Sequence, residues 1–349
     1  MSEPEGFLPA WWCPGPHFQT VWRRLWGEIP SVGLRRERWE TPDHDFLDLD
    51  FLDPAAAPLR EEKAPVVLLL HGLEGSSRAK YILGMLKMVQ SLGWKGAALN
   101  FRSCSGEMNR QRRFYHSGET TDLDWVVRRL IERDPGSPLY LIGFSLGGNV
   151  LLKWLGEQGE KVPGAVRKGV AISVPFDLAV AARLIDRGFS RIYGKVFLQT
   201  LKRKALIKER QYPGLVDPGR VRRIVSFAEF DDQVTAPIHG FQSGLDYWTK
   251  SSSQNFLSDI RLPVLLINAQ DDPFLPVRYF PSRIIKESKW LTADFPLSGG
   301  HTGFVQGRSP WSATYWTESR TSAFLLSDVG GQREGCRIEK NRREDRWSG

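Results

Sequence analysis

The stretch Tyr140–Asn149, YLIGFSLGGN, decides the fold of this chain. It places Ser145 between Gly143 and Gly147, directly after an apolar run and directly before a helical pattern. Where a strand turns sharply into a helix, the serine hydroxyl is pushed out at the tip, and the two glycines leave room for the turn. The peptide N–H of Leu146 would point at the same spot from a helix N-terminus. The stretch therefore predicts a nucleophilic serine beside one donor for a developing oxyanion.

The flanks of this stretch decide how much a five-residue GxSxG pattern can mean. Upstream, residues 137–144 form a short β-prone run that Pro135 and Gly136 introduce. Downstream, apolar residues recur at helical spacing, namely Val150, Leu151, Trp154 and Leu155. This context favours a strand, turn and helix over a tight turn that holds an incidental serine.

The rest of the chain alternates between strand and helix patterns. Helices are expected over 81–92, after Thr121 and from Trp311 to about Ser327. Strands are expected over 34–40, 45–52, 66–71, 95–101, 137–144, 168–173, 262–269 and 290–295. The pattern predicts an α/β fold with about eight strands in a mostly parallel sheet, covered by helices on both faces.

One long gap interrupts the predicted sheet. Between Ser173 and Leu262 the chain has helical patterning and no clear strand, so we expect an inserted helical cap. The predicted organisation is an N-terminal arm (1–33), a first core part (34–176), the cap (177–261), a second core part (262–328) and a tail (329–349). The tail has almost no apolar residues and is expected to be disordered.

Composition narrows the cellular setting. Of 349 residues, 41% are apolar, which suffices for a substantial core, yet no apolar run approaches the roughly 18 residues that span a bilayer. The N-terminus lacks the basic region and apolar segment of a signal peptide. Cys13, Cys104 and Cys336 have no metal or disulfide spacing, and Cys104 is expected to be a small packing residue rather than a reactive thiol. We expect a reducing, cytoplasmic location.

Positive charge is concentrated in one window of the expected cap. Residues 183–223 hold twelve Lys and Arg against three Asp and Glu, a net charge of +9 in a chain whose total is +8. The basic residues alternate with apolar ones such as Ile192, Val196 and Phe197. This pattern indicates either a solvated helix face or a surface that contacts an anionic membrane, at its inner face, or draws in acidic substrates. We expect no nucleic acid as a partner.

A serine nucleophile needs a base and an orienting acid, and two later loops supply them. Asp271 and Asp272 follow the strand 262–269. Asp272 is favoured because it stands four residues before Pro276, the spacing usual in α/β-hydrolases, although the reverse assignment stays open. His301 follows the last strand in SGGHTGF. The order serine, aspartate, histidine is that of the α/β-hydrolase triad.

HGLEGSS, which follows the strand 66–71, supplies the other oxyanion donor. We expect the N–H of Leu73, with Glu74 as the alternative, to face that of Leu146. His71 is expected to bond within its loop. No metal or cofactor is expected, because the metal-ligand spacings are missing.

With these pieces in place, the chain resembles the YheT-type branch of the α/β-hydrolase superfamily, relatives of the ABHD lipid esterases, over roughly residues 7–327. The resemblance is carried by PAWWCPGPHFQT, HGLEGSS, LNFRSCSGE, YHSGET, GFSLGGN, EFDDQVTAPIHGF, AQDDPF and GGHTGF. It implies a carboxylesterase or acylglycerol-lipase-like activity without a cofactor, with a triad at Ser145, Asp272 and His301. Arg102, His116 and Glu119 match the branch pattern and are expected to brace loops beside the site.

The function expected from the sequence is hydrolysis of small acyl esters, including lipid-derived ones such as monoacylglycerols, through an acyl-enzyme on Ser145. Thioester or amide cleavage and acyl transfer on the same residues stay open, because a fold does not determine a substrate. A basic protein that binds membrane or nucleic acid on a hydrolase scaffold is the rival from another class. Trp11 and Trp12 are expected to pack, with a place in the pocket as the alternative.

Overall fold

A nine-stranded sheet forms the centre of the structure, a computed structural model that describes residues 6–53, 61–327 and 337–338. The spatial order is β1-β2-β4-β3-β5-β6-β7-β8-β11, in which the pairs β1–β2 and β2–β4 are antiparallel and all the other pairs are parallel. The strands are β1 (Leu34–Glu40), β2 (Phe46–Leu52), β3 (Val66–Leu70), β4 (Lys95–Asn100), β5 (Leu139–Phe144), β6 (Val166–Ile172), β7 (Val264–Ile267), β8 (Leu291–Phe295) and β11 (Arg337–Ile338). The predicted α/β-hydrolase fold is confirmed.

Helices cover both faces of the sheet, which explains why its central strands are apolar without alternation. In β3, Val66, Leu68 and Leu70 belong to one buried cluster, and Val67 and Leu69 belong to another. The first cluster includes residues of α3 (Thr121–Arg133), α4 (Leu146–Gln158) and α11 (Ser282–Glu287). The second includes residues of α2 (Lys80–Ser91) and α12 (Trp316–Leu326).

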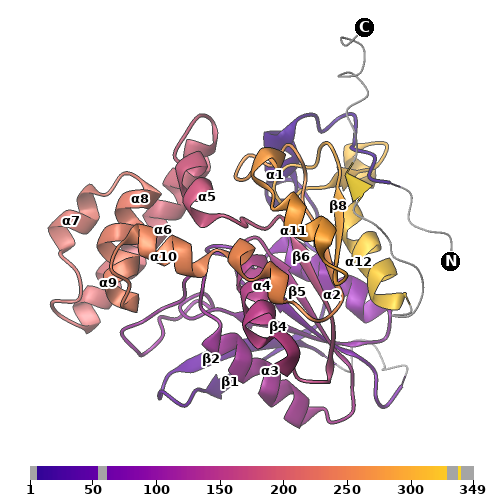
Figure 1. The fold of residues 1–349 in the computed structure, drawn as a ribbon, viewed down its shortest axis with the longest axis horizontal. Coiled ribbons are helices and arrows are strands. Elements are labelled where there is room, and N and C mark those ends of the chain that lie inside the picture. Colours follow the sequence, from indigo (N-terminus) through magenta and orange to yellow (C-terminus); the bar gives the residue numbers. More distant parts are fainter. Residues whose placement is uncertain (1–5, 54–60, 328–336, 339–349) are drawn as a thin grey trace, which may run out of the picture.

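Between β6 and β7 the described chain forms helices only, and we call this insertion the cap. Figure 1 shows the cap helices gathered to one side of the sheet, at the left of the view. They are α5 (Leu178–Ile185), α6 (Ser190–Gln211), α7 (Pro218–Arg223), α8 (Phe227–Phe230), a π-helical turn (Asp231–Thr235), α9 (Ala236–His239) and α10 (Gly244–Ser251). The cap has its own apolar cluster, which includes Leu198, Leu201 and Trp248. Across the described ranges, no helix is both long and apolar enough to cross a bilayer.

Two segments differ from the sequence-based expectations. The arm contains a helix, α1 (Pro16–Leu25), which Pro16 can begin because its missing N–H would have no partner in the first turn. The last helix begins at Trp316 rather than at Trp311, because β10 (Thr314–Tyr315) pairs with β9 (Val305–Gln306) just before it.

Two residues of the expected tail, 337–338, are described in the structure. These two residues pair in parallel with β8, as β11, because the edge of a sheet offers unpaired N–H and C=O groups to any nearby chain. The remainder of the expected tail, 328–336 and 339–349, lies outside the described residues, as does Cys336.

Candidate active site

Ser145 is the single residue between β5 and α4, and its backbone is strained. Its backbone has φ 51° and ψ −117°, a region that costs about 1–3 kcal/mol for a residue with a side chain. A Cβ added to Gly143 would lie 2.4 Å from the carbonyl oxygen of Gly147, and one added to Gly147 would lie 2.6 Å from the Leu70 carbonyl oxygen. Both glycines are therefore required sterically, and the turn holds the Ser145 hydroxyl rigidly at its tip.

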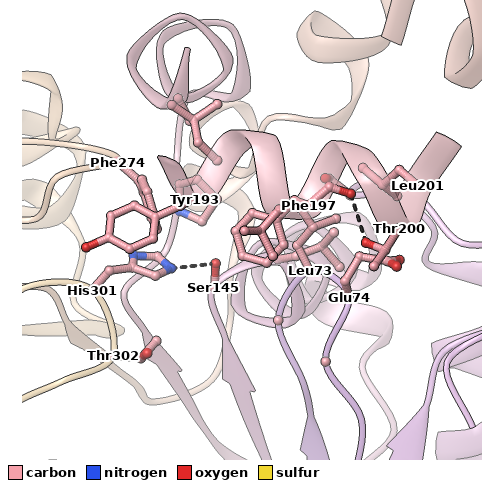
Figure 2. Close-up of a pocket in the computed structure, with 18 of the residues that line it drawn as sticks. Leu73, Glu74, Ser145, Tyr193, Phe197, Thr200, Leu201, Phe274, His301 and Thr302 are labelled. Atoms are coloured by element: carbon pink, nitrogen blue, oxygen red, sulfur yellow. Dashed lines mark hydrogen bonds between the residues drawn. The ribbon is translucent and has the colours of Figure 1, made fainter. Parts of the chain in front are cut away.

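Two hydrogen bonds connect Ser145, His301 and Asp272. Nε2 of His301 lies 2.8 Å from the Ser145 hydroxyl, and Nδ1 of His301 lies 2.8 Å from Oδ2 of Asp272. Figure 2 shows the imidazole pointing at the hydroxyl, with the ring of Phe274 beside it. Because the Asp272 carboxylate can only accept a hydrogen bond, Nδ1 of His301 carries the proton. Nε2 is therefore free to accept a proton from Ser145. The structure thus brings together the three side chains that the sequence singled out from separate loops.

Backbone contacts separate the roles of the two neighbouring aspartates. Asp272 is 1% exposed, and its second oxygen accepts from the N–H of Phe274 at 2.8 Å. Asp271 instead accepts from the N–H of Gly300 at 2.9 Å, and burial together with the nearby charge of Asp272 raises its pKa to about 6. Asp271 is therefore a loop-capping neighbour that holds the segment before His301.

The N-terminal arm also contacts the loop that carries His301. The hydroxyl of Thr20, in α1, accepts from the N–H of His301 at 2.9 Å. The buried Gln19 accepts from the N–H of Val305 at 2.7 Å and donates to its carbonyl at 3.2 Å. A Cβ on Gly300 would lie 2.3 Å from a carbonyl of the arm. Sequence reasoning missed these contacts, since 281 positions separate Thr20 from His301 and no local pattern links them.

The loop after β3 carries the expected oxyanion donors and has an unusual backbone. Glu74 has φ 52°, and its N–H donates to the hydroxyl of Tyr115 at 2.8 Å. That bond occupies the Glu74 amide and favours Leu73 of the two alternatives. His71 is fully buried within the loop, where its Nε2 accepts from the N–H of Phe101 at 3.2 Å and burial lowers its pKa to about 4.

A cavity of about 780 Å³ opens from Ser145 and His301 into the space between core and cap. Helix α6 crosses over the serine, and Figure 2 shows Tyr193, Phe197 and Leu201 of this helix above it. Most of the remaining lining side chains are aliphatic or aromatic. Trp11 and Trp12 are not among them and instead donate to the carbonyls of Arg308 and Gly307. Trp12 packs against Trp22, whereas Trp11 is 79% exposed, so the expected packing holds for Trp12 only.

Arg102, His116 and Glu119 lie in polar or aromatic networks. The guanidinium of Arg102 is buried against Asp45 at 2.6 Å and Asp122 at 2.7 Å, so it ties the loop after β4 to α3. Glu119 pairs with an arginine, and burial lowers the pKa of His116, which lines the cavity, to about 3. In the part of the chain that the structure describes, no three His, Cys, Asp or Glu side chains gather as a metal site would require.

Comparisons with known proteins agree with this architecture. The family model described as the alpha/beta hydrolase fold matches residues 65–292. The candidate esterase YheT of Escherichia coli (strain K12) is 36% identical over 94% of this chain and 95% of its own length. Phospholipase ABHD3 of Mus musculus is 31% identical over 89% of this chain and 76% of its own length. A Pyrococcus furiosus esterase, Pf2001, shares the fold with a TM-score of 0.54 at 18% identity, covering 84% of this chain and 90% of its own. The chain therefore belongs to the α/β-hydrolase superfamily, in the esterase- and lipase-type branch that includes YheT and ABHD3.

Proposed function

We propose that this ester-bond hydrolase acts on carboxylic esters through an acyl-enzyme on Ser145. The observation that supports it is the pair of 2.8 Å hydrogen bonds that link the Ser145 hydroxyl through His301 to Asp272. Serine is a weak nucleophile at its ordinary pKa and becomes effective only beside such an oriented base.

In the proposed mechanism, Nε2 of His301 takes the proton of Ser145 as its oxygen attacks the ester carbonyl. Asp272 keeps the imidazole in the required tautomer and stabilises its protonated form. The N–H groups of Leu73 and Leu146 stabilise the tetrahedral oxyanion. His301 then protonates the departing alcohol and later activates the water that releases the acid. Loss of one such oxyanion donor typically slows turnover about 10²–10³-fold.

The cavity supports acyl esters with an apolar chain as the substrate class, including lipid-derived esters such as monoacylglycerols. A volume of about 780 Å³ lies within the range of roughly 300–1,000 Å³ that is usual for small-molecule sites. The mostly apolar lining favours a hydrocarbon chain through burial, and the charged side chains in the lining are Arg23, Arg24, Glu74, Arg78, Lys80 and Asp231. The printed names of the relatives, esterase and phospholipase, agree with this class.

A fluorophosphonate probe tests the proposal directly. We expect it to label Ser145 in the folded wild-type chain, and we expect Ser145→Ala to lose both labelling and nearly all hydrolysis of a neutral p-nitrophenyl ester. Ser258→Ala, at an exposed serine outside the cavity, is the matched control and should behave as wild type. Labelling of another serine, or turnover that survives in Ser145→Ala, would refute the mechanism.

We also propose peripheral contact with an anionic membrane through the start of α6. Ile192 and Val196 are 53% and 43% exposed there, next to the exposed Arg191 and Lys195. An apolar side chain that inserts beside basic groups is typical of a surface that binds anionic lipid. The lysines further along α6 do not contribute to this surface, because Lys202, Lys204 and Lys208 donate to atoms of the protein itself.

Vesicle flotation measures this contact. The double variant Arg191→Gln and Lys195→Gln should bind anionic vesicles less tightly than wild type, and neither protein should bind zwitterionic ones. Arg128→Gln with Arg283→Gln removes the same charge from exposed positions of the core and is expected to bind as wild type does. Equal binding of anionic vesicles by both double variants would refute the proposed contact.

A further inference from the structure

Two carboxylates line the cavity, and they differ in their partners. Glu74 accepts from the Lys204 ammonium at 2.7 Å, so a cation balances its charge. Asp231 accepts from the indole N–H of Trp248 at 2.7 Å and from the hydroxyl of Thr235 at 2.7 Å. Both donors are neutral, and within residues 6–53, 61–327 and 337–338 no cationic side chain pairs with Asp231. Asp231 therefore has only neutral partners, and the cationic side chains that also line the cavity, Arg23, Arg24, Arg78 and Lys80, do not pair with it.

An unbalanced carboxylate in such a place is costly to the free protein. Buried charges in proteins are normally paired, since transfer of an ionised group out of water is strongly unfavourable. Burial raises the pKa of Asp231 to about 6, and the negative charge of Asp186 acts in the same direction. A cation bound beside Asp231 would lower this pKa again and so favour the ionised form. A cost of this kind, paid inside a ligand cavity, points to a role in binding.

The two hydrogen bonds of Asp231 do not by themselves require a side chain that can carry a charge. Asp231 begins the π-helical turn and joins it to α10 through Trp248. An asparagine could accept from the same indole through its amide oxygen and donate to the Thr235 hydroxyl through its amide nitrogen, without bringing a charge into the cap. π-Helical turns also occur frequently at functional sites.

The neighbouring side chains indicate which ligand would fit. Trp248 and Phe230 line the cavity beside Asp231, together with Phe227 and Tyr247. Aromatic faces attract organic cations, and they do so most strongly where water is excluded. A carboxylate among aromatic rings is suited to an organic ammonium group, whose charge it would neutralise. It is less suited to a small, strongly hydrated metal ion.

We propose that Asp231 and the aromatic side chains around it form a subsite for an ammonium group on the ester substrate. The inference rests on the proposed function, because the same cavity holds Ser145. It narrows the substrate to acyl esters that carry an organic cation at a distance from the scissile bond. None of the lysines and arginines of α6 lines the cavity that holds this subsite.

The experiment compares two series of p-nitrophenyl esters that share their leaving group. One series ends its acyl chain in a trimethylammonium group, and the other ends it in the isosteric, neutral tert-butyl group, each with short, medium and long chains. At the chain length that reaches Asp231, we expect kcat/KM to favour the cationic ester at least about tenfold. Asp231→Asn should abolish that preference and leave hydrolysis of the neutral ester within about twofold.

Asp232→Asn is the matched control, because it removes the same charge from the adjacent position, whose side chain accepts from Gly244 and does not line the cavity. It should keep the preference. A second readout uses wild type alone: the ratio of the two kcat/KM values should rise as pH increases through about 6, where Asp231 ionises. The chemistry at Ser145 is common to both esters and cancels in the ratio. Of the other titratable groups that line the cavity, Glu74 pairs with Lys204, and burial lowers the pKa of His116 to about 3.

The possible results separate the two proposals. No preference for the cation at any chain length, with neutral esters still hydrolysed through Ser145, overturns the subsite and leaves the proposed function intact. Equal loss of the preference in Asp231→Asn and Asp232→Asn also overturns it. Failure of wild type to hydrolyse either series, or to be labelled at Ser145, is a failure of the proposed function itself. If Asp231→Asn does not fold, the wild-type ratio and its pH dependence decide the question.

Discussion

Replacement of Lys204 by methionine should both destabilise the protein and slow its chemistry. The Lys204 ammonium, on cap helix α6, lies 2.7 Å from the carboxylate of Glu74, and the two side chains are 15% and 7% exposed. Glu74 follows Leu73, the proposed oxyanion donor, and its carboxylate also accepts from Tyr115 at 2.7 Å. This contact therefore connects the cap to the loop that would stabilise the oxyanion.

The size of the effect follows from what remains after the substitution. Removal of one partner of a buried ion pair typically costs about 3–5 kcal/mol, because the other charge is left unpaired. Glu74 keeps its bond to Tyr115 and borders the cavity, which favours the lower end, about 3 kcal/mol. At about 2 °C per kcal/mol for a large domain, the midpoint of thermal unfolding should fall by about 6 °C. A loosened Leu73 N–H should lower kcat about tenfold, a part of the roughly 10²–10³-fold loss for a missing donor, with KM little changed.

Thermal unfolding and steady-state hydrolysis of a neutral ester measure both effects, with Lys202→Met as the control. Lys202 lies on the same helix, but it donates at 2.7 Å to the carbonyls of Arg222 and Ile224, inside the cap. Its loss should cost about 1 kcal/mol and leave kcat unchanged. Adding Glu74→Gln to Lys204→Met should restore much of the stability, since the unpaired charge is gone. The reasoning fails if folded Lys204→Met has the kcat of Lys202→Met.

Three further outcomes are expected. Thr20→Val removes the acceptor for the N–H of His301 and should lower kcat several-fold with little change in KM, and an unchanged kcat in steady-state assays would show that the arm does not position the imidazole. Gly147→Ala forces a Cβ against the carbonyl of Leu70, so thermal unfolding should show a loss of about 3 kcal/mol and fluorophosphonate labelling should fall sharply; wild-type stability would contradict the steric account. Asp231 has a folded pKa of about 6 against an ordinary 3.8, so the unfolded chain loses this proton first and the native state loses stability as pH rises between these values. The unfolding midpoint of Asp231→Asn should therefore rise relative to wild type between about pH 4 and pH 6 and stay level above, and a parallel course of the two curves would contradict the shift.

The sequence predicted the sheet well where the evidence is local. β3 is apolar at every position, as a strand covered on both faces must be, and its bounds agree with the expectation to within a residue. The last helix was less predictable, because pairing between residues 314–315 and 305–306 displaces its start. Pairing of that kind depends on which segments meet in space, and no periodicity records it.

For the site, the sequence indicated the loops more reliably than the contacts. Ser145 and His301 could be chosen from their positions after strands, whereas the choice of Asp272 over Asp271 needed coordinates to show which carboxylate meets the imidazole. The sequence predicted the correct total charge of the cap, but it could not show which of the basic side chains are exposed. Lys208 is fully buried and donates to the Asn109 and Gln111 carbonyls, and burial lowers its pKa to about 8.

By itself the sequence determined the turn at Ser145 and the apolar strands that place it, because sterics between adjacent residues and the two-sided burial of a strand are written into consecutive positions. Only the tertiary structure decided which side chains hold that turn's surroundings in place: Thr20 on the histidine loop, Lys204 on Glu74, and Asp231 left without a counter-ion in the cavity wall. The physical reason is that a hydrogen bond or an ion pair acts over a few ångströms, and segments far apart in the chain come within that range only after the core has packed.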